Sequence, residues 1–397
     1  MKIKIKYKSF MKSFFYIVGE ILSYVNRIIY KQKNNIVLYS NLGFRDNVEA
    51  LYRYLIFKKY NKNYKIICAT NEWKKYASEP LPINVKFVNC YLGVFYYLTS
   101  KYFFYCFGKY PIKPTKKQCV VNLWHGMPLK NIGVLVDSKK SNKQNYFSYV
   151  LASSKFFKKY MQIAFQCSNN QVIICGQPRN DDLFNMSVDL KPIFELPYNA
   201  KIICYMPTFR KSDTLNTNNN TLNDCLYEKL KSSKNLEFLN SYLKAINIFL
   251  FIKPHPMDDY DKKFIKKLSN IVYVDDYILK SKNLNTYQFL GNTDVLITDY
   301  SSVYFDYLLL NKPIAFVIDD IQSYSDVRGF IVKNPESIMP GKKIHNQDEF
   351  FDFCKEIANC VDDYKQERKR VNDLVNYYKD GNNCERLLKI IGIEKEE

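Results

Sequence analysis

The feature that most constrains the fold is a repeated alternation of short apolar runs, polar turns and longer helical patterns. The apolar runs have the length of strands, and helical spacing follows the turns. This alternation is typical of parallel sheets, because parallel strands need a long crossover connection that is usually a helix. The expected strands are 35–40, 64–70, 85–90, 119–124, 149–153 and 172–175, then 201–205, 248–252, 271–274, 295–298 and 314–317. The sequence therefore predicts an α/β fold.

The length of 397 residues favours two domains of ordinary size over one. A stretch without periodicity, 184–200, is the expected linker, and a stretch rich in Asn and Thr, 211–224, is an expected loop. Ligands bind at the carboxyl ends of the strands in open parallel sheets, so two such domains facing each other predict a site in a cleft. We expect a basic helix over 1–33, an αβα domain over 34–190, a second one over 200–346, and terminal helices over 347–397.

The charge predicts an anionic partner. Lys and Arg number 59 against 39 Asp and Glu, a formal balance of +20. Nucleic acid, an acidic membrane surface and a phosphorylated substrate all satisfy this excess, and so does a merely solvated lysine-rich surface. The eleven cysteines are odd in number and contain no CxxC pair. They are expected to be reduced thiols in a cytoplasmic compartment, with neither a disulfide framework nor a zinc site.

The N-terminal segment combines basic and apolar residues. Residues 1–33 hold eight Lys or Arg against one acid, Glu20, and their apolar residues recur at helical spacing. Lys12, Glu20 and Arg27 interrupt the apolar stretch too often for a membrane span, and no secretory cleavage pattern follows. Two interpretations stay open: an interfacial helix on an anionic lipid surface, or a first helix packed on its own domain.

Two of the three histidines directly follow expected strands. His125 lies in Trp-His-Gly-Met-Pro-Leu-Lys at 124–130, and His255 lies in Lys-Pro-His-Pro at 253–256. A histidine can take a proton from an attacking hydroxyl or, when charged, donate to a phosphate. A lone histidine is more often structural, but Gly126 allows close backbone approach and the prolines beside His255 fix its turn. These neighbours favour a functional role for both.

Further residues at strand ends suit a phosphate group. Asp299, Ser301 and Ser302 follow a strand at the start of a helix, where backbone N–H groups attract anions. Capping of that helix is the alternative role. Thr208 and Arg210 follow another strand, and arginine binds phosphate in a bidentate manner, although a surface ion pair is its commoner fate. Arg328 and the turn 176–181 are further candidates.

Taken in order, six motifs resemble the CDP-glycerol glycerophosphotransferases of teichoic acid and capsule synthesis. They are Trp-His-Gly-Met-Pro-Leu-Lys at 124–130, Gly-Gln-Pro-Arg-Asn-Asp at 176–181, Pro-Thr-Phe-Arg at 207–210, Lys-Pro-His-Pro at 253–256, Thr-Asp-Tyr-Ser-Ser-Val at 298–303 and Arg-Gly-Phe at 328–330. The resemblance covers roughly residues 35 to 380 and implies a GT-B arrangement of two Rossmann-like domains. It also implies transfer of glycerol phosphate from CDP-glycerol to a hydroxyl of a lipid-linked acceptor, with release of CMP.

The resemblance implies roles for individual residues. His125 is similar to the base for the acceptor hydroxyl, and His255 to the group that stabilises the donor diphosphate. Met127 and Phe209 stand where Thr and Trp are common in the family, departures that concern the substrate and not the chemistry. No cofactor or dedicated metal site is expected, since the acidic pair 258–259 reads as loop. The expected donor and phosphate ligands are Gly126, Thr208, Arg210, Lys253, Asp299, Ser301, Ser302 and Arg328.

The expected partners are CDP-glycerol or CDP-ribitol, a lipid-linked glycan or polyol-phosphate acceptor, and an anionic membrane surface. The expected location is the cytoplasmic face of the cell membrane, as a peripheral protein. Two alternatives remain: a glycosyltransferase of the same fold that uses a nucleotide sugar, and a nucleic-acid-binding protein. The second is motivated by the charge and by 16% aromatic residues, but no motif that reads nucleic acid occurs, and no nucleic-acid partner is expected.

Overall fold

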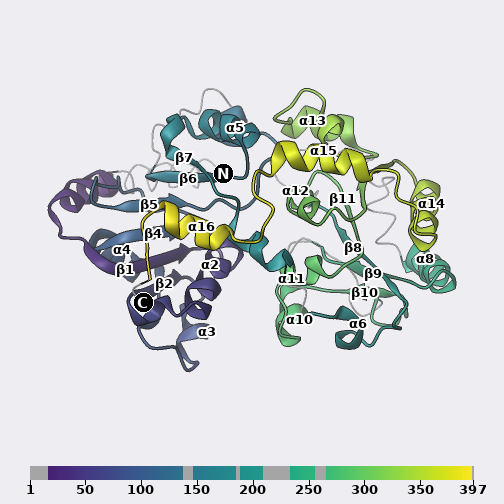
Figure 1. Ribbon diagram of the computed structural model, residues 1–397, viewed down its shortest axis with the longest axis horizontal. Coiled ribbons are helices and arrows are strands. Elements are labelled where there is room, and N and C mark those ends of the chain that lie inside the picture. The colour runs from purple at the N-terminus through teal and green to yellow at the C-terminus, as the bar shows by residue number, and fades with distance from the viewer. Residues whose placement is uncertain (1–16, 137–145, 185–187, 209–232, 255–264, 396–397) are drawn as a thin grey trace, which may run out of the picture. The chain divides into compact units, whose positions relative to one another are not determined.

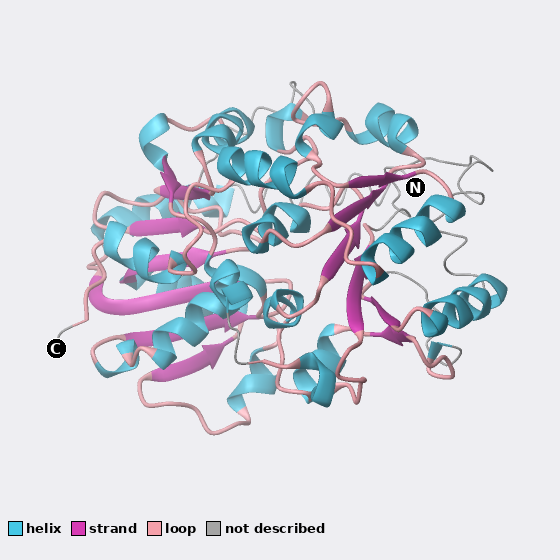
Figure 2. Cartoon of the chain, turned by 45° about the vertical axis from the view of Figure 1, so that its right-hand side comes forward, coloured by secondary structure: helices cyan, strands magenta, loops and turns pink. Residues whose placement is uncertain are grey.

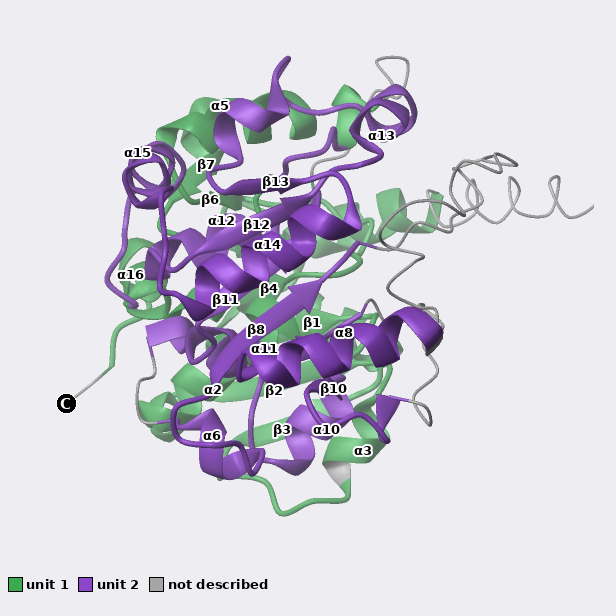
Figure 3. Ribbon diagram, turned by 90° about the vertical axis from the view of Figure 1, so that its right-hand side faces the viewer, with its two compact units in different colours: residues 1–127, 133–181, 382–397 green, residues 128–132, 182–381 purple. Residues whose placement is uncertain are grey.

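The computed structural model of the chain describes residues 17–136, 146–184, 188–208, 233–254 and 265–395. It forms two compact units, which Figure 3 shows in different colours. Unit 1 comprises residues 1–127, 133–181 and 382–397, and unit 2 comprises residues 128–132 and 182–381. The predicted loop at 211–224 lies outside the described residues. Each unit contains one wholly parallel sheet, so the predicted α/β class is confirmed.

The sheet of unit 1 has seven strands in the order β3-β2-β1-β4-β5-β6-β7 (Figure 1). Its interior is apolar on both faces, because helices cover both sides of a parallel sheet. For instance, Ile36, Val37 and Leu38 of β1 are all fully buried. The strands are β1 (Gln32–Ser40), β2 (Lys65–Thr70), β3 (Val85–Val88), β4 (Ser100–Tyr105), β5 (Cys119–Asn122), β6 (Tyr149–Ala152) and β7 (Val172–Ile174).

The sheet of unit 2 repeats this pattern with six strands in the order β10-β9-β8-β11-β12-β13. All five residues of its strand β9 are buried. The strands are β8 (Lys201–Met206), β9 (Ile248–Ile252), β10 (Ile271–Tyr273), β11 (Val295–Thr298), β12 (Ile314–Val317) and β13 (Lys342–Ile344).

Helices lie on the faces of both strand layers (Figure 2). In unit 1 they are a helix over 17–28, α2 (Asp46–Phe57), α3 (Trp73–Ala77), α4 (Cys90–Thr99), α5 (Lys155–Phe165) and α16 (Asn383–Ile390). In unit 2 they are α6 (Leu190–Ile193), α8 (Ser233–Ala245), α10 (Asp276–Ser281), α11 (Thr286–Gly291), α12 (Val303–Tyr307), α13 (Ile321–Arg328), α14 (Gln347–Ala358) and α15 (Lys365–Val375).

Each sheet reverses its strand order at one point. In unit 1 the reversal falls between the neighbours β1 and β4, and in unit 2 it falls between β8 and β11. At such a reversal the connections leave in opposite directions, which opens a space beyond the carboxyl ends of the two strands. The segments after these strand ends are therefore where side chains can meet a ligand in each unit.

The structure contains two strands, β4 and β13, that the sequence pattern does not predict. Ser100 begins β4 directly after α4 ends at Thr99, so the helix and the strand merge into one apolar and aromatic run. Strand β13 has only three residues. The run 85–90, predicted as one strand, ends as a strand at Val88, because Asn89 caps α4 by accepting the N–H of Leu92. Caps of this kind end the preceding strand sharply.

Two segments belong to a different unit from the residues beside them in sequence. The end of the chain, residues 382–397, completes unit 1, where Leu387 and Leu388 of α16 are fully buried in its core. Residues 128–132 belong to unit 2, where Lys130 pairs as an antiparallel bridge with Phe330. The two units therefore do not follow the continuous domain ranges expected from the sequence, because long-range packing decides to which unit each segment belongs.

Candidate active site

His125 lies in unit 1, three residues beyond the end of β5. Trp124 before it has a positive φ of 56°, and Gly126 after it has φ 124°, a value that favours glycine. The His125 ring stacks on Phe107, with ring centroids 4.9 Å apart, and lies 4.1 Å from the ring of Trp124. A tight turn and two aromatic rings thus set the position of the imidazole.

The charge state of His125 is set by burial and by two charged neighbours. Burial lowers the pKa of His125 from its usual value, the carboxylate of Asp46 opposes this, and the guanidinium of Arg179 adds to it. A histidine with a lowered pKa is neutral at pH 7. Neutral imidazole is the form that can accept a proton from a hydroxyl, so the environment suits a general base.

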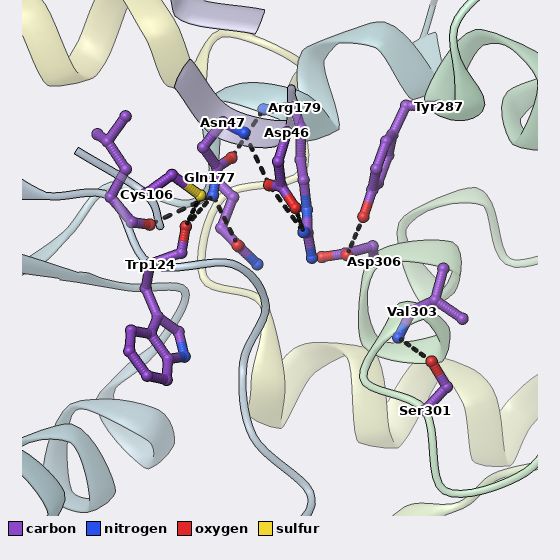
Figure 4. Close-up of polar contacts among 11 residues, drawn as sticks. Asp46, Asn47, Cys106, Trp124, Gln177, Arg179, Tyr287, Ser301, Val303 and Asp306 are labelled. Carbon is purple, nitrogen blue, oxygen red and sulfur yellow. Dashed lines mark hydrogen bonds and ion pairs between the residues drawn. The ribbon is translucent and has the colours of Figure 1, made fainter. Parts of the chain in front are cut away.

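Asn47, at the start of α2, holds the backbone before His125 (Figure 4). Its Nδ2 lies 2.9 Å from the carbonyl oxygen of Trp124 and 3.2 Å from that of Leu123. The thiol of Cys106 donates to the same Trp124 carbonyl at 2.8 Å. Asn47 itself is fully buried. The peptide that leads into His125 is therefore held from two sides.

Asn47 also reaches the turn after β7. Its Nδ2 lies 3.2 Å from Oε1 of Gln177, and its Oδ1 accepts the backbone N–H of Arg179 at 3.1 Å. Beside it, Nη1 of Arg179 contacts both carboxylate oxygens of Asp46, at 2.9 and 2.8 Å. The motif at 176–181 is thereby joined to the surroundings of His125. Sequence reasoning missed Asp46 and Asn47, whose only signal is that they follow β1 at the reversal of strand order.

In unit 2, Thr208 and Asp299 meet where the strand order reverses. Thr208 follows β8, Asp299 follows β11, and these two strands are neighbours. Oδ2 of Asp299 accepts the backbone N–H of Thr208 at 2.8 Å and its hydroxyl at 2.9 Å. Thr298, the last residue of β11, donates from Oγ1 to the carbonyl of Met206 at 2.6 Å. Three hydrogen bonds thus lock the two strand ends together.

Ser301 and Ser302 stand where α12 begins. Oγ of Ser301 lies 3.4 Å from the backbone N of Val303, a long hydrogen bond (Figure 4). Ser302 is the residue before the helix, and its side chain makes no capping bond. Both serines are half-buried. The capping role considered as the alternative is thus weak for Ser301 and not filled by the side chain of Ser302.

Lys253 extends this group from β9, the strand on the other side of β8. It follows the strand end directly, is buried, and its Nζ lies 2.7 Å from Oδ1 of Asp276. His255 and Arg210, which the sequence predicts close by, lie outside the described residues. Thr208, Lys253, Asp299, Ser301 and Ser302 therefore come from three adjacent strand ends of one sheet, while His125 and Gly126 belong to unit 1.

Arg328 lies at the end of α13 and is exposed. The next residue, Gly329, has φ 65°, a backbone conformation that favours glycine, and the Nδ2 of Asn131 lies close to it. The backbone N–H of Asn131 donates to the carbonyl of Gly329, and that of Ile331 to the carbonyl of Leu129. The end of the first histidine motif is thus paired with the Arg-Gly-Phe motif inside unit 2.

Comparison with known proteins assigns the family. The family model described as CDP-Glycerol:Poly(glycerophosphate) glycerophosphotransferase matches residues 21–392. The teichoic acid glycerol-phosphate transferase of Staphylococcus aureus is 27% identical over 293 residues, which cover 68% of this chain and 69% of that protein. The teichoic acid poly(glycerol phosphate) polymerase of Bacillus spizizenii is 26% identical over 392 residues, which cover 92% of each protein.

Solved structures agree on the fold. A variant of the wall teichoic acid polymerase TagF, soaked with CDPG for 15 minutes, superposes with a TM-score of 0.71 at 21% identity. The match covers 98% of this chain and 97% of that chain. The predicted GT-B-like class, with two Rossmann-like units, is confirmed. The chain belongs to the CDP-glycerol:poly(glycerophosphate) glycerophosphotransferase family, as its ordered motifs predict.

Proposed function

We propose that this protein transfers glycerol phosphate, or a related polyol phosphate, from CDP-glycerol to a hydroxyl of a membrane-linked acceptor and releases CMP. The reaction serves the synthesis of teichoic acid or a capsule-type polymer. The observation that carries the proposal is the family match over residues 21–392, which contains every predicted site residue. The location of five predicted donor ligands, Thr208, Lys253, Asp299, Ser301 and Ser302, at adjacent strand ends of unit 2 supports it.

In this reaction His125 acts as the base. The acceptor oxygen forms a bond to the phosphorus of the glycerol phosphate, its proton passes to the imidazole, and the bond from that phosphorus to CMP breaks. The lowered pKa of His125 keeps the imidazole neutral and ready to accept that proton at pH 7. Phosphoryl transfer otherwise depends on positioning and on charge neutralisation, which requires few further groups.

Residues of unit 2 bind the donor. We assign the diphosphate to His255, Arg210, Lys253 and the start of α12, and Arg328 to the same anionic substrate. The charge of Lys253 is little screened by water because its side chain is buried. Its Nζ contacts Asp276 in this structure, so donor binding replaces that contact with one to phosphate. We propose that the reaction needs no cofactor. Within the described residues no group of three or more His, Cys, Asp or Glu side chains could hold a metal ion. We expect EDTA to leave the rate unchanged.

The test is release of CMP by the purified protein from CDP-glycerol and, separately, from CDP-ribitol, with and without a lipid-linked acceptor. The proposal predicts CMP that depends on the acceptor, and the preferred donor identifies the polyol. Release of UDP from a nucleotide sugar, with no CMP from either CDP-linked donor, would overturn it in favour of a glycosyltransferase.

We also propose that the helix over 17–28 binds the anionic cytoplasmic face of the membrane. The helix packs on unit 1 through its small and polar residues. Gly19 faces Pro111, Oγ of Ser23 accepts the backbone N–H of Lys113 at 2.9 Å, and Asn26 donates to Oε1 of Gln118 at 2.7 Å. Among the described residues, no helix has both the length and the apolar character needed to cross a bilayer.

Several large apolar residues of this helix point away from the protein. Ile17, Ile21, Tyr24 and Ile28 are each more than half exposed, which is unusual for one side of a helix in water. An apolar helix face beside basic residues is typical of proteins that lie on a lipid surface. Of the basic residues expected to meet lipid phosphate, Lys31 instead lies inside: it is buried, donates to Asn26 and Leu98, and has its pKa lowered to about 8 by burial.

Binding to vesicles of phosphatidylglycerol tests this role. Ile21 and Ile28 are 58% and 84% exposed, and Ile83, elsewhere in unit 1, is 72% exposed. Each isoleucine that enters the lipid contributes about 2 kcal/mol. The double variant Ile21→Ser with Ile28→Ser should therefore bind vesicles at least about tenfold more weakly. The matched control Ile83→Ser should bind like the parent, and equal binding by all three proteins would refute the membrane role.

A further inference from the structure

We infer that Asp46, Asn47 and Arg179 are positioning residues for His125: Asn47 fixes the backbone that carries it, and the ion pair of Asp46 with Arg179 sets the charge around its ring. The inference rests on the proposed role of His125 as the base. It extends that role to three residues from two other segments of unit 1, the start of α2 and the turn after β7.

The backbone part of the inference follows from the contacts of Asn47. One fully buried side chain contacts the carbonyls of Leu123 and Trp124 and the backbone N–H of Arg179. Trp124 has a positive φ, which most residues avoid, so the turn into His125 needs outside support. A buried amide with both its donors and its acceptor engaged supplies that support at a fixed geometry.

The electrostatic part follows from the ion pair. Nη1 of Arg179 contacts both carboxylate oxygens of Asp46, and the Arg179 side chain is only 6% exposed. The carboxylate of Asp46 also accepts the backbone N–H of Asn47 at 2.7 Å, so it is tied to the residue that holds the His125 turn. Charges this well shielded from water act strongly on a nearby titrating group.

The two charges act on His125 in opposite directions. The carboxylate of Asp46 favours the protonated imidazole, and the guanidinium of Arg179 disfavours it. The His125 ring also lies 4.1 Å from that of Trp124, and a hydrogen bond to the backbone of Cys106 favours its protonated form. On its other neighbours, the Arg45 guanidinium lies 5.5 Å from the centroid of Phe107, and burial raises the pKa of the Cys106 thiol well above its usual value, so that the thiol stays neutral. Burial is thus the largest influence on the proton affinity of the base, and the charges of Asp46 and Arg179 adjust it in opposite directions.

The test measures the pKa of His125 by NMR of histidine-labelled protein, without substrate. The chain has three histidines, so the His125 signal is identified by its loss in His125→Gln. Asp46→Asn should lower the pKa of His125 and Arg179→Gln should raise it, each by about one pH unit. Arg179→Lys should restore the parent value. Arg53→Gln, which removes a surface ion pair with Glu49 on the same helix, should leave it unchanged.

Shifts in the same direction, or no shift, in folded Asp46→Asn and Arg179→Gln would overturn the electrostatic part, since mere disruption of packing has no reason to act with opposite signs. If Arg179→Gln does not fold, the nearly isosteric Asp46→Asn decides alone, and an unchanged or raised pKa contradicts the inference. The readout needs no turnover, so failure of the proposed reaction is seen separately in the CMP assay.

For the backbone part, Asn47→Ala should lower kcat by about tenfold or more relative to the parent, with acceptor and donor at saturation. The KM for the donor should stay close to the parent value. The His125 signal should also broaden or move. Unfolding in urea shows whether Asn47→Ala is folded. If it is not, Asn47→Ser is measured in its place. An unchanged kcat in either folded variant, or a loss confined to KM, would overturn the positioning role.

Discussion

Asp299 and Thr208 share two hydrogen bonds through one carboxylate oxygen, which accepts both the backbone N–H and the hydroxyl of Thr208. The pair joins the ends of β11 and β8, the two strands between which the order of the sheet reverses. Because the hydroxyl proton of Thr208 points to Asp299, it is not offered to a phosphate in this arrangement. We therefore propose that Thr208 supports donor binding indirectly, because its bonds to Asp299 hold the backbone two positions before Arg210.

Asp299→Ala should weaken the binding of CDP-glycerol by about tenfold or more and destabilise unit 2. The substitution leaves the N–H of Thr208 without its acceptor, which costs about 1–3 kcal/mol. Thr208→Val removes only the hydroxyl bond and should have a smaller effect of about 1 kcal/mol on stability. Calorimetric titration gives the affinity and urea unfolding gives the stability.

The control for this pair is Ser241→Ala, which removes an exposed hydroxyl bond of 3.1 Å to the carbonyl of Glu237 in the same unit. It should bind the donor like the parent. Unchanged donor affinity in a folded Asp299→Ala variant would show that the link between β8 and β11 has no part in donor binding.

Asp181 should make the stability of the protein depend on pH. Its carboxylate accepts the backbone N–H groups of Asn383 and Cys384, at 2.8 Å each, at the start of α16. Burial raises the pKa of Asp181 from 3.8 to about 6. Between about pH 4 and pH 6, the folded protein therefore keeps a proton on Asp181 that the unfolded chain has released. The stabilising contribution is complete below about pH 4 and is lost as the pH rises through 6.

The comparison that isolates this effect is Asp181→Asn, which cannot titrate. The free energy of unfolding of the variant minus that of the parent should increase from pH 4.5 to pH 7, as measured by urea unfolding at each pH. A difference that is constant across this range would contradict a raised pKa at Asp181.

His255→Ala should impair stabilisation of the donor diphosphate. We expect a large fall in kcat/KM for CDP-glycerol in the CMP assay, because a positive or donating group opposite developing phosphate charge acts mainly in the transition state. The exposed His345 supplies a matched control, and His345→Ala should turn over like the parent. Equal rates for both variants would remove His255 from the mechanism.

The sequence predicts most of the two sheets, because eleven strands are apolar runs that end at polar turns. It also predicts Thr208, Asp299 and His125 as strand-end residues, since that location is readable from the same runs. Asp46 and Asn47 escape such reasoning because their partners are distant: Asn47 and Arg179 are 132 residues apart and meet only when β1 and β7 enter one sheet.

The orientation of the helix over 17–28 shows a second limit. Its periodicity predicts an apolar face, and the usual rule turns that face toward the core. The structure turns it outward, because Ser23, Asn26 and Lys31 find buried hydrogen-bond partners in residues 98–118. Periodicity identifies a face but does not say which face has partners elsewhere in the chain.

The most direct test of the account compares acceptor-dependent release of CMP by the parent and by His125→Gln, together with calorimetric binding of CDP-glycerol to each. Loss of the base removes the proton acceptor but leaves the ligands of unit 2 intact. The account predicts that release falls by about a hundredfold or more while donor affinity stays within about twofold. Near-parent release of CMP by His125→Gln would contradict it.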